Sequence, residues 1–181
     1  MKDKQDLFLE LFEPQKERLW RFCLSISMNY EDAKELLAET MYQTCLNFDK
    51  VRNETAFLSY MFTIASRVHN TSKKKSRIEL WTSEDLDDLS GNTETPEDLL
   101  EYKEMCQALD TLPTDQKEVI ILFDLMGFSR KEISEIQNTN IENVKARLYR
   151  GRKKLADLLN LELRKDNTEV NEDITLPRSI V

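Results

Sequence analysis

The chain has 181 residues, of which 40% are hydrophobic and 33% are charged, and its formal net charge is −8. This length fits one medium domain or two small ones, and the low glycine and proline content favours a helical protein. No uninterrupted apolar run approaches the roughly 20 residues that span a bilayer. Acidic residues interrupt the N-terminal segment, which lacks the apolar core of a signal peptide. We therefore expect a cytoplasmic protein without membrane insertion.

Residue types that carry catalysis or metal binding are sparse in this sequence. His69 is the single histidine, so a zinc site would lack a second candidate ligand nearby. Cys23, Cys45 and Cys106 are far apart and odd in number, which predicts reduced thiols rather than a disulfide or a metal cluster. The sequence also lacks a glycine-rich phosphate loop and a histidine-based triad. We expect no enzyme, no metal and no cofactor.

Charge and hydrophobicity divide the chain into four parts. Residues 1–78 and 105–160 are helical blocks, whereas residues 79–104 are acidic and predict a linker. Residues 161–181 have little periodicity and predict a disordered tail. Strand patterns are missing from the sequence. The chain is therefore predicted to be all-α, with two small helical domains joined by an acidic linker.

In the first block, the apolar pattern predicts two helical segments around Pro14 and a third helix that begins at Asn29 or Tyr30. The apolar stripe of the third helix is Ala33, Leu36, Leu37, Met41 and Leu46. Thr55 is predicted to cap a fourth helix. The stripe of that helix is Phe57, Met61, Ile64, Ala65 and Val68.

The second block is predicted to open with a helix that runs to Met126. Pro113 suits a first helical turn, because the missing amide hydrogen has no partner there in any case. Gly127 is predicted to end the helix, since glycine readily adopts the left-handed conformation of a C-terminal stop.

Two further helices joined by a tight turn are predicted next. Ser129 with Glu132 three residues later forms a capping box, which places a helix start there. Asn138 can adopt the left-handed conformation that a turn requires. Asn140 is then predicted to cap a long last helix. This order is typical of a helix-turn-helix.

Residues 129–155 concentrate positive charge in an otherwise acidic chain, with eight Lys and Arg residues against three Glu residues. Val144, Leu148 and Leu155 fall on one face of the last helix and are predicted to be buried. A basic opposite face indicates a helix that lies in a DNA major groove, and the alternative is a solvated surface helix. Arg147 lies near the edge of the core face and is expected to be partly structural. The predicted DNA-binding residues are Arg130, Lys131, Asn140, Asn143, Lys145, Arg147, Tyr149, Arg150 and Lys153.

Aromatic and basic residues also gather between residues 57 and 77, and no acid occurs between residues 66 and 78. Rings can stack on unpaired bases while cations hold phosphates, so this segment predicts contacts to single-stranded DNA. For Phe57 and Phe62 we favour burial in the core instead. The predicted contacts are Tyr60, Arg67, Lys73, Lys74, Lys75 and Arg77.

One segment, LDTLPTDQKEVIILFDLMGFSRKEISEIQNTNIENVKARLYRGRKKLADLL, resembles region 4 of the extracytoplasmic-function (ECF) RNA polymerase sigma factors of the sigma-70 family. Two further segments, RLWRFCLSISMNYEDAKELLAETMYQTCLNFDKV and AFLSYMFTIASRVHNTSKKKSR, extend this resemblance to region 2 of the same family. It implies a region 2-like domain at residues 1–78 and a region 4-like helix-turn-helix at residues 105–160. It further implies binding to core RNA polymerase, recognition of the −35 and −10 promoter elements, DNA melting, and an anti-sigma factor as a partner.

By the same resemblance, the polymerase contact is expected at Asp32, Leu36, Glu39 and Thr40. The sequence departs from the family pattern at residues 137–139, where a small apolar turn is usual, and at Tyr60 and Arg67, where Trp and Asn are usual. Base preference is therefore not carried over. Two alternatives remain open at this point: a helix-turn-helix regulator that binds palindromic DNA as a dimer, and a helical interaction module that does not bind DNA.

Overall fold

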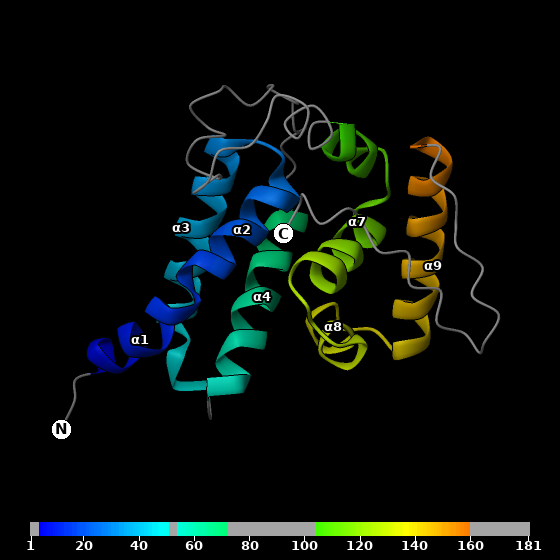
Figure 1. The fold of residues 1–181 in the computed structure, drawn as a ribbon. Coiled ribbons are helices and arrows are strands. Elements are labelled where there is room, and N and C mark those ends of the chain that lie inside the picture. Colours follow the sequence, from blue (N-terminus) through cyan, green and yellow to red (C-terminus); the bar gives the residue numbers. More distant parts are fainter. Residues whose placement is uncertain (1–3, 51–53, 72–103, 160–181) are drawn as a thin grey trace. The chain divides into compact units, whose positions relative to one another are not determined.

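A computed structural model of the chain describes residues 4–50, 54–71 and 104–159. All regular elements in these ranges are helical (Figure 1), which confirms the predicted all-α class. The described helices belong to two compact units. Within the same ranges, no helix is both long and apolar enough to cross a membrane. The predicted linker up to residue 103 and the predicted tail lie outside the described residues.

The first unit consists of α-helices and two short 3-10 helices (Figure 1). In chain order they are α1 (Lys4–Phe12), η1 (Glu13–Gln15), α2 (Lys16–Ser27), α3 (Tyr30–Leu46), η2 (Phe48–Lys50) and α4 (Glu54–Thr71). Helix α3 packs against both α2 and α4. Pro14 lies in η1 between α1 and α2, which confirms the two predicted segments around it.

Aromatic rings form much of the core of the first unit. The ring of Phe8 stacks on Phe12 at 5.5 Å between centroids and meets the rings of Phe48 and Phe57 edge-on at 5.6 and 5.9 Å. These contacts tie α1 to η2 and α4 with the offset and perpendicular geometries that aromatic quadrupoles prefer. Phe57 and Phe62 are both fully buried, which confirms that their rings belong to the core.

The buried stripe of α3 differs from the predicted one. Leu36 is buried as expected, but Met41 and Leu46 are 41% and 59% exposed. Thr40 and Thr44 occupy the interior instead, and both are fully buried. The Thr44 hydroxyl donates a hydrogen bond to the Thr40 carbonyl at 2.7 Å, so the Thr44 donor is satisfied in the interior. The buried hydroxyl of Thr40 itself has no hydrogen-bond partner within the described residues. Thr44 can therefore replace an apolar residue in the stripe because its hydroxyl bonds to its own helix.

Helix starts in the first unit are partly as predicted. Asn29 caps α3, because its side-chain oxygen accepts a hydrogen bond from the amide of Asp32 at 2.9 Å. The cap predicted at Thr55 is wrong, since α4 begins one residue earlier, at Glu54. Thr55 thus lies within the first turn of the helix rather than before it.

The three cysteines are free thiols, with Cys23 buried, Cys45 exposed and Cys106 half-buried. Burial raises the pKa of the Cys23 thiol to about 12, because a thiolate would lose its hydration there. Among the described residues, no three His, Cys, Asp or Glu side chains lie together in a way that could hold a metal ion.

The second unit contains the helical residues 104–110, α7 (Thr114–Ile120), the π-helix η3 (Ile121–Leu125) and α9 (Ile141–Leu158). The prediction for Pro113 is off by one residue. Pro113 precedes α7 with an extended ψ of 142°, and its carbonyl accepts from the amides of Gln116 and Lys117. It therefore sits at the N-cap position rather than inside the first turn.

The π-helix is a feature that the apolar periodicity did not predict. It is closed by a hydrogen bond from the Met126 amide to the Ile121 carbonyl at 3.0 Å, five residues apart. The Phe128 amide then donates to the Leu122 carbonyl at 2.9 Å. Gly127 has a φ of +70°, which confirms it as the predicted stop.

Helix α8 (Arg130–Ile136) and the turn that leads to α9 follow the predicted caps. The Ser129 amide donates to the Glu132 carboxylate at 2.8 Å, and the Glu132 amide donates to the Ser129 hydroxyl at 3.3 Å. Asn138 has a φ of +49°. The side-chain oxygen of Asn140 accepts from the Asn143 amide at 2.8 Å. The capping box, the left-handed residue and the last cap are all confirmed.

Candidate nucleic-acid interface

Helix α9 presents one apolar face to the second unit. Val144, Leu148 and Leu155 are buried there, as predicted. Gly151 lies close against α7, because a Cβ atom at this position would lie 2.7 Å from Cδ1 of Ile120. Close packing along this seam fixes which face of α9 is turned outward.

One cation of α9 is buried in the unit. The guanidinium of Arg152 makes two hydrogen bonds to the carboxylate of Asp124 on η3, one from Nε at 3.2 Å and one from Nη2. The two side chains are only 6% and 11% exposed. Sequence reasoning did not single out this residue, although Arg152 follows Leu148 by four positions and hence shares its face.

Two further cations of α9 are bound by the segment around α7. Arg147 forms an ion pair with Asp115 at 2.9 Å, and its side chain is 25% exposed. Lys154 donates to the carbonyl oxygen of Thr111 at 2.7 Å. The expectation that Arg147 is partly structural agrees with this geometry, and its predicted DNA contact has to compete with Asp115.

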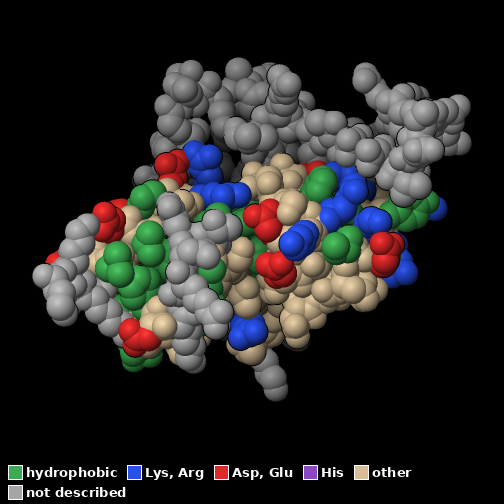
Figure 2. All heavy atoms as spheres, turned by 90° about the horizontal axis from the view of Figure 1, so that it is seen from below, with side chains coloured by type: hydrophobic (Ala, Val, Ile, Leu, Met, Phe, Trp, Pro, Cys, Tyr) green, Lys and Arg blue, Asp and Glu red, His purple; other side chains and the backbone are tan. Residues whose placement is uncertain are grey.

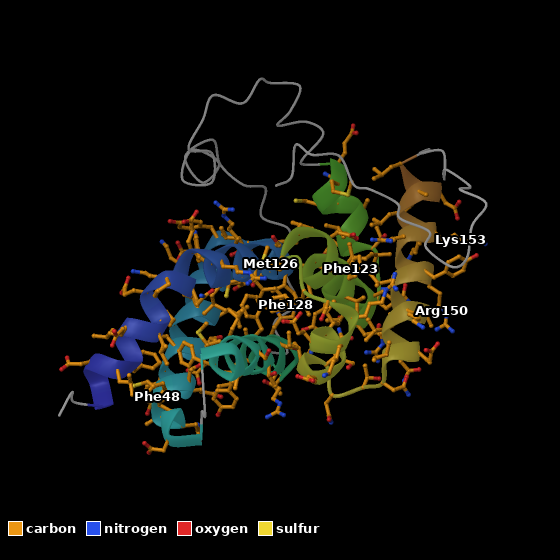
Figure 3. The ribbon with its side chains drawn as sticks, turned by 60° about the horizontal axis from the view of Figure 1, so that its bottom comes forward. Phe48, Phe123, Met126, Phe128, Arg150 and Lys153 are labelled. Atoms are coloured by element: carbon orange, nitrogen blue, oxygen red, sulfur yellow. The ribbon has the colours of Figure 1, made fainter. Side chains whose placement is uncertain are left out.

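The remaining cations of α9 point outward. The Arg150 and Lys153 side chains are exposed, and neither has an ion-pair or hydrogen-bond partner within the described ranges. Figure 3 shows both on the side of α9 that is turned away from Phe123. Tyr149 is 52% exposed next to them. This outward face therefore offers two unneutralised positive charges and one ring, which suits a polyanion.

The N-terminal turns of α9 carry the other predicted reading residues. The Asn143 side chain is exposed, and Lys145 forms an ion pair with Glu142 at 2.9 Å on the exposed surface. An exposed pair of this kind contributes little stability, so the lysine can exchange its partner for a phosphate or a base. Asn140 uses its side-chain oxygen for the cap.

Arg130 and Lys131, at the start of α8, differ in how open their side chains are to solvent. The guanidinium carbon of Arg130 lies 5.5 Å from the ring centroid of Phe123, which is a cation–π distance. Lys131 is exposed. Figure 2 shows Lys and Arg side chains gathered over the second unit, with Asp and Glu side chains among them. The basic face thus carries charges of both signs, and its unpaired cations within the described ranges are Arg150 and Lys153 of α9.

A second buried charge in this unit was not predicted. The Lys117 ammonium is 7% exposed and pairs with the Asp110 carboxylate at 3.1 Å. Burial lowers the pKa of Lys117, and Asp110 partly opposes that shift. The pair joins α7 to the helical residues 104–110, so its role is structural.

The candidate single-strand site in the first unit is only partly described. Tyr60 is half-buried and Arg67 is exposed on α4. Phe57 and Phe62 are buried and have no ring face open to bases. The four remaining predicted contacts lie outside the described residues: Lys73, Lys74, Lys75 and Arg77.

The predicted polymerase contact on α3 needs a correction. Asp32 is half-buried and Glu39 is exposed, so both can meet a partner. Leu36 and Thr40 are 5% and 0% exposed, because they face the interior of the helix bundle. Neither presents a side chain to a partner in this structure.

Comparisons with known proteins come from sequence and from structure. A family model described as sigma-70, region 4, matches residues 103–155. The chain is 32% identical over 142 residues to an ECF RNA polymerase sigma factor, EcfG, of Rhodopseudomonas palustris, with 76% of this chain and 77% of that protein covered. It is 29% identical over 171 residues to the RNA polymerase sigma factor SigV of Bacillus subtilis, with 92% and 99% covered.

Among solved structures, the sigma factor RpoE of Bartonella quintana, determined in complex with the anti-sigma factor NepR, is similar with a TM-score of 0.68. The identity is 23%, and the match covers 86% of this chain and 98% of that one. At this identity the likeness supports the fold.

Proposed function

The chain belongs to the ECF RNA polymerase sigma factors, and from that premise we propose how its residues serve promoter recognition. As a sigma factor it binds core RNA polymerase and directs it to promoters through the −35 and −10 elements, where it helps to open the DNA. No catalytic step is assigned to the chain itself, and the site of action is the cytoplasm, where the polymerase works. The domain limits proposed are residues 1–78 for region 2 and 105–160 for region 4, with residues 79–104 as the linker.

The observation that carries the upstream contact is the division of the cations on α9. Arg147 and Arg152 are engaged by carboxylates of the same unit, whereas Arg150 and Lys153 are exposed and unpaired within the described ranges. A helix with one face locked by its own domain and the other open and positive suits docking into a major groove.

In this proposal the −35 element is read from the N-terminal part of α9. Asn143 and Lys145 reach base edges there, because the first turns of a recognition helix enter the groove most deeply. Arg150 and Lys153, one to two turns later, bind backbone phosphates. Lys131 on α8 and Tyr149 on α9 flank these contacts.

Contacts to the −10 element are proposed for the first unit. Tyr60 offers a half-buried ring and Arg67 an exposed cation on α4, and the predicted cations at residues 73–77 follow in the chain. Stacking on a ring together with charge attraction to phosphates suits the unpaired strand of an opening promoter. Phe57 and Phe62 are fully buried, so they act as core residues and not as DNA contacts.

The polymerase contact is proposed for the outer face of α3. Glu39 and the partly exposed Asp32 supply negative charge, and Met41, Tyr42 and Leu46 are 41%, 59% and 59% exposed. Figure 2 shows hydrophobic side chains gathered over the first unit with acidic ones beside them. An apolar patch with a charged rim is the usual composition of a protein interface.

An anti-sigma factor is proposed as a further partner. The support is the similar fold of RpoE, which was solved in complex with the anti-sigma factor NepR. Such a partner would cover DNA-binding and polymerase-binding faces until it is released.

The experiment that tests the function is capture of polymerase followed by transcription. The tagged full chain should retain core polymerase subunits from a cell lysate, and added to purified core polymerase it should start transcripts at specific promoters. A chain that binds palindromic duplex tightly as a dimer, and that neither captures nor redirects polymerase, would contradict the proposal and favour an ordinary regulator.

A further inference from the structure

The buried ion pair between Asp124 and Arg152 joins η3 to α9 across 28 residues of chain. Two N–H groups of one planar guanidinium bind the two oxygens of one carboxylate. A bidentate contact of this kind fixes orientation as well as distance, which a lysine in the same place would not do.

The neighbourhood of the pair restricts α9 further. The guanidinium carbon of Arg152 lies 5.2 Å from the ring centroid of Phe123, and Arg130 lies 5.5 Å from the same ring. Directly before Arg152, Gly151 lies close against α7, since a Cβ atom there would meet Cδ1 of Ile120 at 2.7 Å. Residues 151 and 152 are therefore fixed in both rotation about the helix axis and distance from α7.

This restraint lies between the two exposed cations of α9. Arg150 and Lys153 adjoin residues 151 and 152 in the chain, and successive residues of an α-helix differ by about 100° in direction. Fixing positions 151 and 152 therefore fixes the direction of positions 150 and 153. Figure 3 shows Arg150 and Lys153 turned away from Phe123, which lies on the restrained side.

We infer that Asp124 and Arg152 form a positioning pair, which aims Arg150 and Lys153 at DNA phosphates without touching the DNA. The inference rests on the proposed function of α9. If the pair aims these cations, its loss should reduce the number of phosphate contacts even when the stability of the unit is unchanged.

The test separates aiming from stability with the double variant D124L/R152M. Replacement of both members of a buried pair by apolar residues often preserves stability, but it removes the bidentate contact. The full-length variants are each combined with core polymerase. The DNA probe is a promoter duplex selected from a random-sequence pool by the wild-type holoenzyme. Affinity is measured as a function of salt, because each lost phosphate contact lowers the log–log slope by about 0.9.

Four chains are compared: the wild type, R150A/K153A, D124L/R152M and the combination of all four substitutions. R150A/K153A should lower the slope by about 1.8 in the wild-type background. D124L/R152M should lower it by about 1 while thermal unfolding and polymerase capture stay unchanged. In that background R150A/K153A should have less than half of its original effect.

Full additivity of the two double variants, or a wild-type slope for D124L/R152M, would overturn the inference. No effect of R150A/K153A in the wild-type background would instead overturn the proposed function of α9. If D124L/R152M does not fold, R152K takes its place, because it keeps the charge near Asp124 but lacks the two parallel N–H groups. A folded R152K with a wild-type slope would also contradict the inference.

Discussion

The two units of the chain place their ion pairs differently. In the first unit, the pairs of Arg21 with Glu17 and of Lys34 with Glu31 lie on the surface, with side chains at least half exposed. The second unit has a surface pair too, Lys145 with Glu142, but it also buries the cations of two pairs. Lys117 and Arg152 are 7% and 6% exposed, and their partners Asp110 and Asp124 are 28% and 11% exposed. The comparison shows that a basic sequence segment contains cations of two kinds, those that hold the domain together and those that remain for DNA.

The largest expected loss of stability comes from a substitution in the aromatic core of the first unit. Phe57→Ala removes a fully buried ring that meets Phe8 and Phe48, and it should reduce the free energy of unfolding by about 4 kcal/mol. Urea denaturation of the full chain, followed by circular dichroism, measures the loss. Tyr42→Ala, at a position 59% exposed, is the control and should change stability by less than about 0.5 kcal/mol. Equal losses in the two variants would show that the ring cluster does not stabilise this unit.

The buried pair of the second unit comes next. Arg152→Met leaves the Asp124 carboxylate, which is 11% exposed, without its partner, and should cost about 3 kcal/mol in the same assay. Arg21→Met breaks a surface pair and should cost no more than about 1 kcal/mol. Similar values for the two substitutions would remove the distinction between the units.

Alanine substitutions at two glycines of the second unit distinguish the cost of side-chain crowding from the cost of backbone strain. Gly151→Ala should cost about 1 kcal/mol, because its Cβ would lie 2.7 Å from Cδ1 of Ile120, the flexible end of a side chain that would have to shift. Gly127→Ala meets no atom within 4 Å but has a φ of +70°, so it should cost about 1 kcal/mol through strain alone. Ile120→Val removes the crowding atom and should recover part of the loss in Gly151→Ala only. Recovery in both glycine variants, or in neither, would contradict crowding at residue 151.

A smaller difference is expected in the dependence of stability on pH. The Cys23 thiol stays protonated in the folded chain up to a pKa of about 12, while the unfolded chain ionises above 9.0. The contribution of Cys23 to the free energy of unfolding is therefore fully present below pH 9.0, and about 1.4 kcal/mol of it is lost by pH 10.

Lys117 changes the dependence of stability on pH in the opposite direction to Cys23, because burial lowers its pKa in the folded chain. The unfolded chain binds more protons between that lowered pKa and 10.5, so this residue makes stability rise with pH across that window. Denaturation at a series of pH values should show a flatter alkaline loss for Cys23→Ala and a steeper one for Lys117→Met. Curves parallel to the wild type for both variants would be the contrary result.

Local features of the fold were predictable because a few neighbouring residues decide them. The capping box of Ser129 and Glu132, the left-handed Asn138 and the cap at Asn140 all depend on spacing within one turn. The choice of Thr40 rather than Met41 for the interior of α3 depends on the packing of the bundle, which hydrophobicity alone does not specify.

The candidate site was predictable as a helix but not cation by cation. Charge counting assigned Arg147 and Arg150 to DNA, with Arg147 expected to be partly structural. Whether Arg147 or Arg150 is open depends on Asp115, which lies far along the chain and meets Arg147 only in the fold. The π-helix that presents Asp124 to Arg152 likewise leaves no mark in the apolar periodicity.

The most direct measurement compares promoter-specific transcription by core polymerase with the wild-type chain and with K145A/R150A. The chain should support initiation at a selected promoter, and the double substitution should reduce both initiation and binding to a duplex that carries the upstream element. The salt slope of that binding should fall by about 0.9, as expected for the one phosphate contact that Arg150 makes. Unchanged transcription and unchanged binding would contradict the assignment of the outward face of α9 to promoter DNA.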